Sequence, residues 1–167
     1  MGRYYRSHTA VIGFTPLDHV RQSFMQYIES VRPQPTRPFP LYNTWYDIRD
    51  FSYPKLFDTI ENFKATLVDR YDLQLDAFVI DDGWDNLQSL WEIDSTRFPQ
   101  GFNPITEKLK EINSSMGLWI SPWNGYGDAR DQRMAWARAK GYKTSGMHLC
   151  LGSEKYFREF KDKVIRY

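Results

Sequence analysis

The sequence lacks the features that mark several common protein classes. Only one of its 167 residues, Cys150, is a cysteine, so no disulfide can form within the chain. Its 22 basic and 21 acidic residues leave a formal net charge of +1, which argues against a nucleic-acid or membrane-surface partner. The three histidines, His8, His19 and His148, share no ligand spacing, so we expect neither a metal site nor another cofactor.

Long apolar runs are also missing. No stretch approaches the length of a membrane span or of a signal-peptide core, so we expect a soluble chain with no membrane partner. This favours a cytoplasmic location but does not establish the compartment. The chain is too short for a complete eight-stranded α/β barrel, which typically needs about 250 residues.

Aromatic side chains, by contrast, make up 17% of the chain, and one of them follows a conspicuous pair of acids. The apolar run 77–80 predicts a strand buried on both faces, and Asp81, Asp82, Gly83 and Trp84 come directly after it. Because ionised carboxylates are not buried unpaired, this strand should end at a mouth that meets water or a polar ligand. There Trp84 would offer a flat apolar face to a sugar ring. The alternative is an ordinary Asp-Gly turn with Trp84 closing the core.

Hydrophobic periodicity indicates strands and helices in alternation. From residue 41 onward, strand–helix units follow one another, which favours an α/β fold with a parallel sheet and right-handed crossovers. Four prolines between positions 33 and 40 can hold neither helix nor central strand, so a boundary is expected there. The predicted strands are 9–14, 41–48, 77–81 and 117–124, and the predicted helices are 16–31, 54–67, 104–112, 128–140 and 153–167.

Three tryptophans at predicted strand ends are evenly spaced. Trp45, Trp84 and Trp123 each lie 39 residues from the next, which is about the length of one unit of an α/β barrel. We therefore predict an incomplete (β/α)8 (TIM) barrel that contains the first three βα units and is preceded by a linker helix. Active sites of such barrels lie at the carboxyl ends of the strands, and the same edge binds ligands in open doubly wound sheets.

Four segments carry a family resemblance: Asn43–Trp45, Phe78–Trp84, Arg97–Gly101 and Gly117–Pro122. In order and spacing they resemble melibiase-type α-galactosidases of glycoside hydrolase family 36, with raffinose synthases nearby. The resemblance implies three parts. Residues 1–14 would be the end of a β-sandwich domain, 15–40 a linker helix and proline-rich connection, and 41–167 a truncated TIM-barrel catalytic domain.

The resemblance also implies roles for the strand-end residues. Asp81 and Asp82 would accept hydrogen bonds from the hydroxyls of an α-galactoside or a related oligosaccharide, and charge-assisted bonds of this kind are the stronger class. Trp45 and Trp84 would line the sugar pocket, with Trp123 as a further candidate.

Catalysis by this chain is not predicted. A retaining glycosidase needs a nucleophile and an acid/base carboxylate about 5 Å apart, and the resemblance implies that both lie on later strands. Asp81 and Asp82 cannot form that pair, because adjacent residues of a strand point to opposite faces; Asp47 with Asp81 is geometrically easier. The apolar stripe of the last helix still runs at Tyr167, which suggests truncation. We therefore expect a non-catalytic fragment of an α-galactosidase-like hydrolase, and the alternative is a non-catalytic carbohydrate-binding or regulatory module.

The remaining polar patterns suggest no further site. The basic side chains in and after the 128–140 helix, including Arg130, Arg133 and Arg138, are expected to form a solvated face. Gly125 and Gly127 lack the third glycine and the strand-to-helix context of a nucleotide-binding loop.

Overall fold

The chain divides into two compact units, Met1–Pro38 and Phe39–Tyr167, in the computed structural model, which describes residues 9–167. In the first unit, a 3-10 turn, η1 (Leu17–His19), leads into helix α1 (Val20–Val31), as predicted. The predicted strand 9–14 is wrong, because these residues form no strand. A strand is stable only beside other strands, and the described part of this unit offers none. Residues 1–8 of the predicted sandwich remnant lie outside the described residues.

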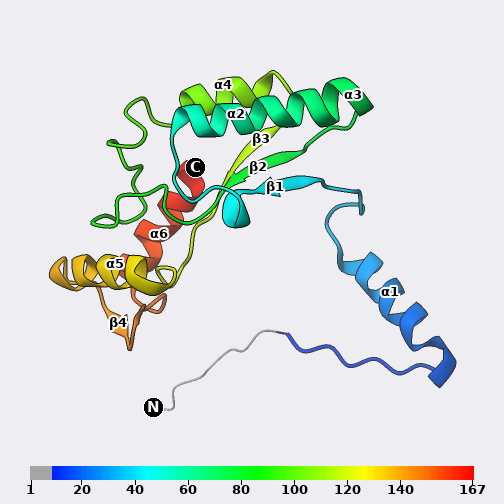
Figure 1. The fold of residues 1–167 in the computed structure, drawn as a ribbon. Coiled ribbons are helices and arrows are strands. Elements are labelled where there is room, and N and C mark those ends of the chain that lie inside the picture. Colours follow the sequence, from blue (N-terminus) through cyan, green and yellow to red (C-terminus); the bar gives the residue numbers. More distant parts are fainter. Residues whose placement is uncertain (1–8) are drawn as a thin grey trace, which may run out of the picture. The chain divides into compact units, whose positions relative to one another are not determined.

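The second unit is built on a parallel three-stranded sheet. Its strands β1 (Leu41–Asn43), β2 (Ala77–Ile80) and β3 (Ser115–Leu118) lie in the order β1-β2-β3 (Figure 1). Both neighbouring pairs are parallel, and Val79 lies between Asn43 on one side and Gly117 on the other. The predicted parallel arrangement of these three strands is confirmed.

β2 ends one residue before its predicted end, and the other two strands differ more from the sequence prediction. β1 stops at Asn43 because its side chain accepts a hydrogen bond from the Trp45 backbone N–H at 2.8 Å. That bond begins the 3-10 turn η2 (Thr44–Tyr46), where the sequence predicted more strand. β3 ends at Leu118, six residues before its predicted end, because β2 offers partners only up to Ile80.

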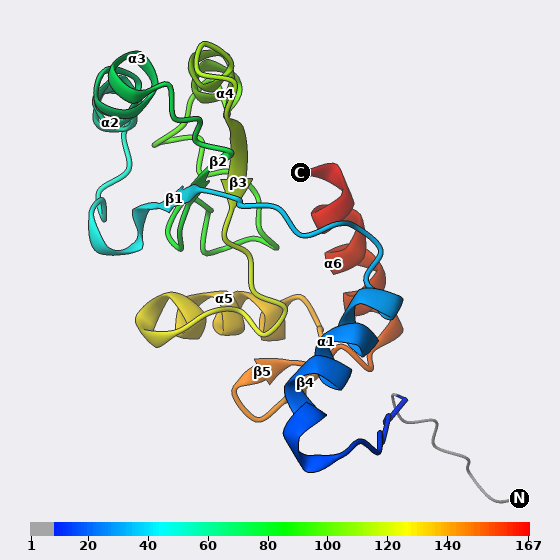
Figure 2. The same cartoon turned by 90° about the vertical axis from the view of Figure 1, so that its right-hand side faces the viewer.

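Helices cover one face of this sheet. Figure 2 shows α2 (Tyr53–Phe63) and α4 (Asn103–Lys110) side by side above the strands, and the two helices contact each other. α2 continues through a π-helical segment, η3 (Lys64–Val68), into the short α3 (Asp69–Tyr71). The side chains packed between these helices and β2 are almost fully buried: Leu56, Ile60, Phe78, Ile80, Ile105 and Leu109.

The remaining elements follow β3. Helix α5 (Gly127–Ala139) ends before Gly141, whose φ of +73° suits the glycine that stops a helix. A two-stranded antiparallel pair, β4 (Thr144–Ser145) and β5 (His148–Leu149), and helix α6 (Glu154–Arg166) complete the unit. Both C-terminal helices were predicted. No helix of the described residues has the length and apolarity to cross a membrane.

Candidate functional site

The carboxyl ends of β1 and β2 are joined by a buried hydrogen bond. The Asp81 backbone N–H donates to Thr44 Oγ1 at 2.9 Å, and both residues are buried. Asp81 Oδ1 accepts the backbone N–H of Asp82 at 2.9 Å. Its other oxygen, Oδ2, accepts no hydrogen bond from the described part of the chain. Asp81 is therefore a nearly buried carboxylate that keeps one oxygen for another donor.

Arg133 of α5 holds the carboxylates of the loop that follows β2. Its Nη2 donates to Asp82 Oδ1 at 2.5 Å and to Asp85 Oδ1 at 2.6 Å. Its Nε donates to Asp85 Oδ2 at 2.9 Å, and its Nη1 donates to the Asn124 carbonyl at 2.9 Å. The guanidinium also stacks 4.2 Å from the centroid of the Trp91 ring. All three guanidinium nitrogens thus donate to the protein, and Trp91 covers one face of the group.

The prediction that the basic side chains of α5 form a solvated face is wrong for Arg133. Its side chain is 3% exposed and that of Asp85 is fully buried. The reason is electrostatic, because a buried carboxylate requires a compensating charge, and α5 lies where it can supply one. One signal in the sequence could have indicated this. Arg133 stands four residues before Ala137, which is buried, so the two lie on the same face of the helix.

Burial and ion pairing act in opposite directions on this cluster. Burial raises the pKa of Asp85 above its usual value, and the hydrogen bonds and charge of Arg133 only partly offset that effect. Burial would lower the pKa of Arg133, but its bonds to Asp85 and Asp82 outweigh burial and raise that pKa. Arg133 therefore remains a cation, and Asp85 binds a proton more readily than an exposed aspartate does.

Glycines of positive φ stand at two turns near the site, one against the cluster and one against Phe51. Gly125 has a φ of +83°, and a Cβ there would lie 2.8 Å from Arg133 Nη1 and 3.1 Å from Asp82 Oδ2. Gly83 has a φ of +116°, and a Cβ there would lie 3.3 Å from Phe51 Cε2. An L side chain at either position would be strained and crowded. The close approach of the Gly125 loop to the cluster, and of Gly83 to Phe51, therefore depends on glycine.

A cavity of about 430 Å³ opens beside these carboxylates. Trp45 borders it with 38% of its surface exposed, and the Arg49 guanidinium lies 4.2 Å from the centroid of the Trp45 ring. The lining combines two aromatic side chains, two acids and two exposed arginines. Its principal side chains are Trp45, Arg49, Asp82, Asp85, Leu87, Arg97 and Tyr126.

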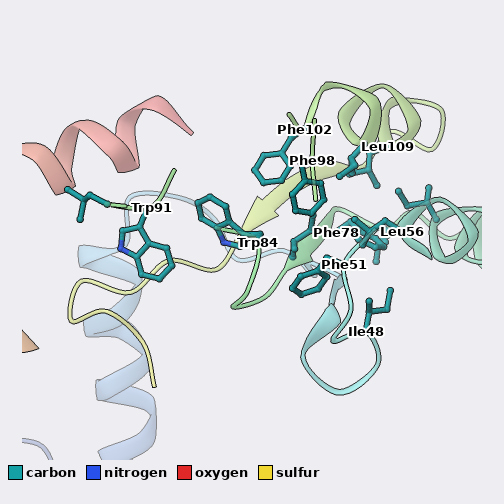
Figure 3. Packing of buried hydrophobic residues seen from close by; sticks show 14 of the residues in the cluster. Ile48, Phe51, Leu56, Phe78, Trp84, Trp91, Phe98, Phe102 and Leu109 are labelled. Carbon is teal, nitrogen blue, oxygen red and sulfur yellow. The ribbon is translucent and has the colours of Figure 1, made fainter. Parts of the chain in front are cut away.

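Trp84 does not lie at this mouth, so the expectation that it is exposed is wrong. Its side chain is fully buried, and Figure 3 shows it within the hydrophobic core beside Trp91 and Phe102. Its Nε1–H donates to the Trp119 carbonyl at 2.8 Å. The positive φ of Gly83 lets the chain turn back after Asp82, which sends the next side chain inward. The structure therefore agrees with the alternative reading, in which Trp84 closes the core.

Of the five predicted sugar-binding residues, the structure brings Asp82 and Trp45 together at the cavity. Asp81 lies directly before Asp82 but does not line the cavity, and Trp123, although 45% exposed, does not line it either. Sequence reasoning missed Thr44, Asp85 and Arg133. Among residues 9–167, no three His, Cys, Asp or Glu side chains are grouped so that they could hold a metal ion.

The fold and the cavity together indicate the class of protein. The chain is a mixed α/β protein with a parallel three-stranded sheet, and a polar cavity lies beside the carboxyl edge of that sheet. Its fold is similar to that of the α-galactosidase TtGalA from Thermus thermophilus, solved in complex with p-nitrophenyl α-D-galactopyranoside. The TM-score is 0.58 at 22% identity, over 86% of this chain and 31% of that one.

Sequence comparison then specifies the relatives. The chain is 31% identical over 93 residues to α-galactosidase 1 of Pediococcus pentosaceus, covering 52% of this chain and 12% of the relative. It is 31% identical over 117 residues to α-galactosidase Mel36A of Lactobacillus acidophilus, covering 65% of this chain and 14% of the relative. An Escherichia coli α-galactosidase is 31% identical over 97 residues, 53% of this chain and 13% of the relative. No protein-family model matches the chain.

These relatives confirm the resemblance predicted from the strand-end segments. The curated homologues of this chain are α-galactosidases of the glycoside hydrolase family 36 type, over about 65% of its length. The chain spans only 12% to 15% of the length of these relatives.

Proposed function

We propose that the cavity beside the carboxyl edge binds the sugar ring of an α-galactoside. In this proposal the second unit is the first part of a (β/α)8 barrel of an α-galactosidase-type glycoside hydrolase. Two features support the barrel: the strands follow one another in chain order, and α2 and α4 lie together on one face of the sheet. The α-galactosidase names of the relatives support the substrate class.

The observation that carries the proposal is the pairing of Asp82 with Trp45 at one cavity. A carboxylate accepts hydrogen bonds from sugar hydroxyls, and bonds to an ionised acceptor are shorter and stronger than neutral ones. Arg49 covers one face of the Trp45 indole, and the exposed remainder of the ring offers an apolar surface for the C–H face of a sugar. Together the two side chains provide the polar and apolar contacts that a pyranose needs.

The same cavity does not supply a hydrolytic pair. A retaining glycosidase needs two carboxylates that flank the scissile bond about 5 Å apart. Asp82 and Asp85 both bind Nη2 of Arg133, so a guanidinium occupies the space where the glycosidic bond would have to lie. We therefore propose that these acids hold the sugar, and that a nucleophile and an acid/base are not contributed by this cavity.

A binding experiment tests the proposal. The chain should bind p-nitrophenyl α-D-galactopyranoside by isothermal titration calorimetry more tightly than the corresponding α-glucoside, because a fixed carboxylate distinguishes hydroxyl epimers. Asp82→Asn should weaken the binding about tenfold, the equivalent of one charge-assisted hydrogen bond. Asp58→Asn, at an exposed position of α2 outside the cavity, is the matched control and should leave the affinity unchanged.

The same ligand also reports cleavage. We expect no sustained release of p-nitrophenol from the wild-type chain. Equal affinity for the galactoside and the glucoside would favour a general carbohydrate-binding module over an α-galactosidase-type site. A hydrolytic activity that releases p-nitrophenol, copurifies with the chain and is absent from Asp82→Asn would overturn the claim that the cavity only holds the sugar.

A further inference from the structure

We propose that Arg133 is a positioning residue for sugar recognition, which fixes the Asp82 carboxylate in the orientation that selects one hydroxyl epimer. The inference rests on the proposed function, since it concerns the way in which Asp82 meets a ligand. Arg133 itself does not line the cavity. It acts through Asp82, from a helix that begins 45 residues further along the chain.

The bonds of Arg133 to Asp82, Asp85 and Asn124, called the Arg133 clamp below, differ from a surface ion pair in geometry and burial. Nη2 binds Asp82 Oδ1 at 2.5 Å, while the rest of the guanidinium is anchored by two bonds to Asp85 and one to the Asn124 carbonyl. Stacking on Trp91 fixes the plane of the guanidinium. The Arg133 side chain is 3% exposed and that of Asp82 is 14% exposed, so water competes little for these bonds. Arg133 is thus held independently of Asp82.

The clamp engages only one oxygen of the carboxylate. Oδ1 of Asp82 is bound by Arg133, whereas Oδ2 accepts no hydrogen bond from residues 9–167. A Cβ at position 125 would lie 3.1 Å from that oxygen, so the glycine found there avoids crowding it. Oδ2 is therefore the atom available to a ligand hydroxyl, and its direction is set by the bond at Oδ1.

A carboxylate fixed in this way should discriminate better than a mobile one. A terminal sp³–sp² torsion such as χ2 of aspartate is broad, so an unclamped carboxylate could turn to meet either epimer of a hydroxyl. With Oδ1 bound, turning toward the wrong epimer would break a partly buried charge-assisted bond. The expected contribution of Arg133 is therefore to the ratio of affinities for two epimers, more than to either affinity alone.

Lysine should not replace this arginine. The guanidinium reaches three acceptor groups at once through a planar fork, and an ammonium on a flexible stem cannot reproduce that arrangement. Lysine does retain the positive charge that Asp82 and Asp85 require. Arg133→Lys therefore separates charge compensation from positioning.

The test compares epimer selectivity among full-length variants that are verified as folded by near-UV circular dichroism. Titration with p-nitrophenyl α-D-galactopyranoside and with its α-gluco epimer gives the ratio of dissociation constants for each variant. We expect Arg133→Lys to lower that ratio about tenfold, the size of one charge-assisted hydrogen bond. Arg138→Lys, the same exchange at an exposed position of the same helix, should leave the ratio unchanged.

A double-mutant cycle distinguishes positioning from a merely structural role. If Arg133 acts through Asp82, Arg133→Lys should have no further effect on the ratio in an Asp82→Asn background. A lower melting temperature with an unchanged ratio would overturn the inference. Should Arg133→Lys not fold, Asp85→Asn serves in its place, because it loosens the anchor of Arg133 and keeps Asp82. The ratio should again fall, and an unchanged ratio would again contradict the inference.

The proposed function and this inference fail in different ways. If the wild-type chain binds neither glycoside, the proposed function is wrong and the inference falls with it. If the wild-type chain prefers the galactoside and Arg133→Lys keeps that preference within about twofold, the sugar site stands and only the positioning role is overturned.

Discussion

A single side chain, Arg133, pairs with both acids beside the cavity. Its bond to Asp85 is buried and its bond to Asp82 is partly buried. Removing one partner of a buried ion pair typically costs about 3–5 kcal/mol because the other charge is left uncompensated. The buried pair need not add net stability over an apolar substitute. What it supplies is a carboxylate held at a defined place next to solvent, which is what ligand binding requires.

Asp85 should make stability depend on pH in an unusual direction. Burial raises the pKa of its carboxyl above the usual 3.8, despite the Arg133 guanidinium. The folded state therefore binds more protons than the unfolded state just above that pH, so the contribution of Asp85 to stability is lost as pH rises through the raised pKa. Urea unfolding between pH 4 and pH 7 should show the stability of the wild type falling relative to that of Asp85→Asn as pH increases.

The comparison with Asp85→Asn cancels the titration of the carboxylates outside the Arg133 cluster, which both proteins share. A relative stability that instead rises with pH would mean that ion pairing with Arg133 outweighs burial and lowers the pKa of Asp85. That outcome would contradict the balance described for the cluster.

At the scale of elements, the spacing of β2 and β3 depends on one glycine. A Cβ at Gly117 would lie 2.9 Å from Val79 Cγ2 on the neighbouring strand, and this position is not one of positive φ. The missing side chain, rather than an unusual backbone conformation, is what the position requires. The sheet therefore has little room for a larger residue between its second and third strands.

Gly117→Ala should destabilise the second unit by overpacking this contact, by about 1–3 kcal/mol. The free energy of unfolding in urea measures the change. Gly13→Ala is the matched control, because no atom lies within 4 Å of its added Cβ, and it should be close to neutral. Adding Val79→Ala to Gly117→Ala should recover part of the loss. Strictly additive effects of the two substitutions would contradict a direct clash.

Local patterns identified most elements but not the contacts between them. The apolar run of β2 and the apolar faces of α2 and α4 each lie within one short segment, so the sequence could predict them. The burial of Trp84 could not be predicted in this way, since it depends on the Trp119 carbonyl, 35 residues away. Arg133 reaches acids 48 and 51 residues earlier in the chain. Such pairings arise from tertiary packing, which periodicity along one element does not report.

At the scale of the whole molecule, the sheet of the second unit has two notable regions. The candidate site lies at the carboxyl ends of its strands, and β3 lies at its side without a further partner strand among the described residues. β3 has β2 as its single neighbour in the sheet of the described residues. A groove of about 650 Å³ runs along β3, with Met116, Leu118 and Val164 among its lining side chains. Unpaired strand edges of this kind favour association with other chains. We therefore expect association to increase with protein concentration, and solution experiments should use low concentrations.

The central claim is that the carboxyl edge binds an α-galactoside between Asp82 and Trp45, while Trp84 belongs to the core. The most direct measurement is a two-dimensional 1H–15N NMR titration with methyl α-D-galactopyranoside, in which Trp→Phe variants assign the indole N–H signals. The Trp45 signal should shift in a saturable manner, and that of Trp84, bound to the Trp119 carbonyl, should stay in place. An unchanged Trp45 signal at saturating sugar, or a response confined to Trp84 or Trp123, would contradict this account.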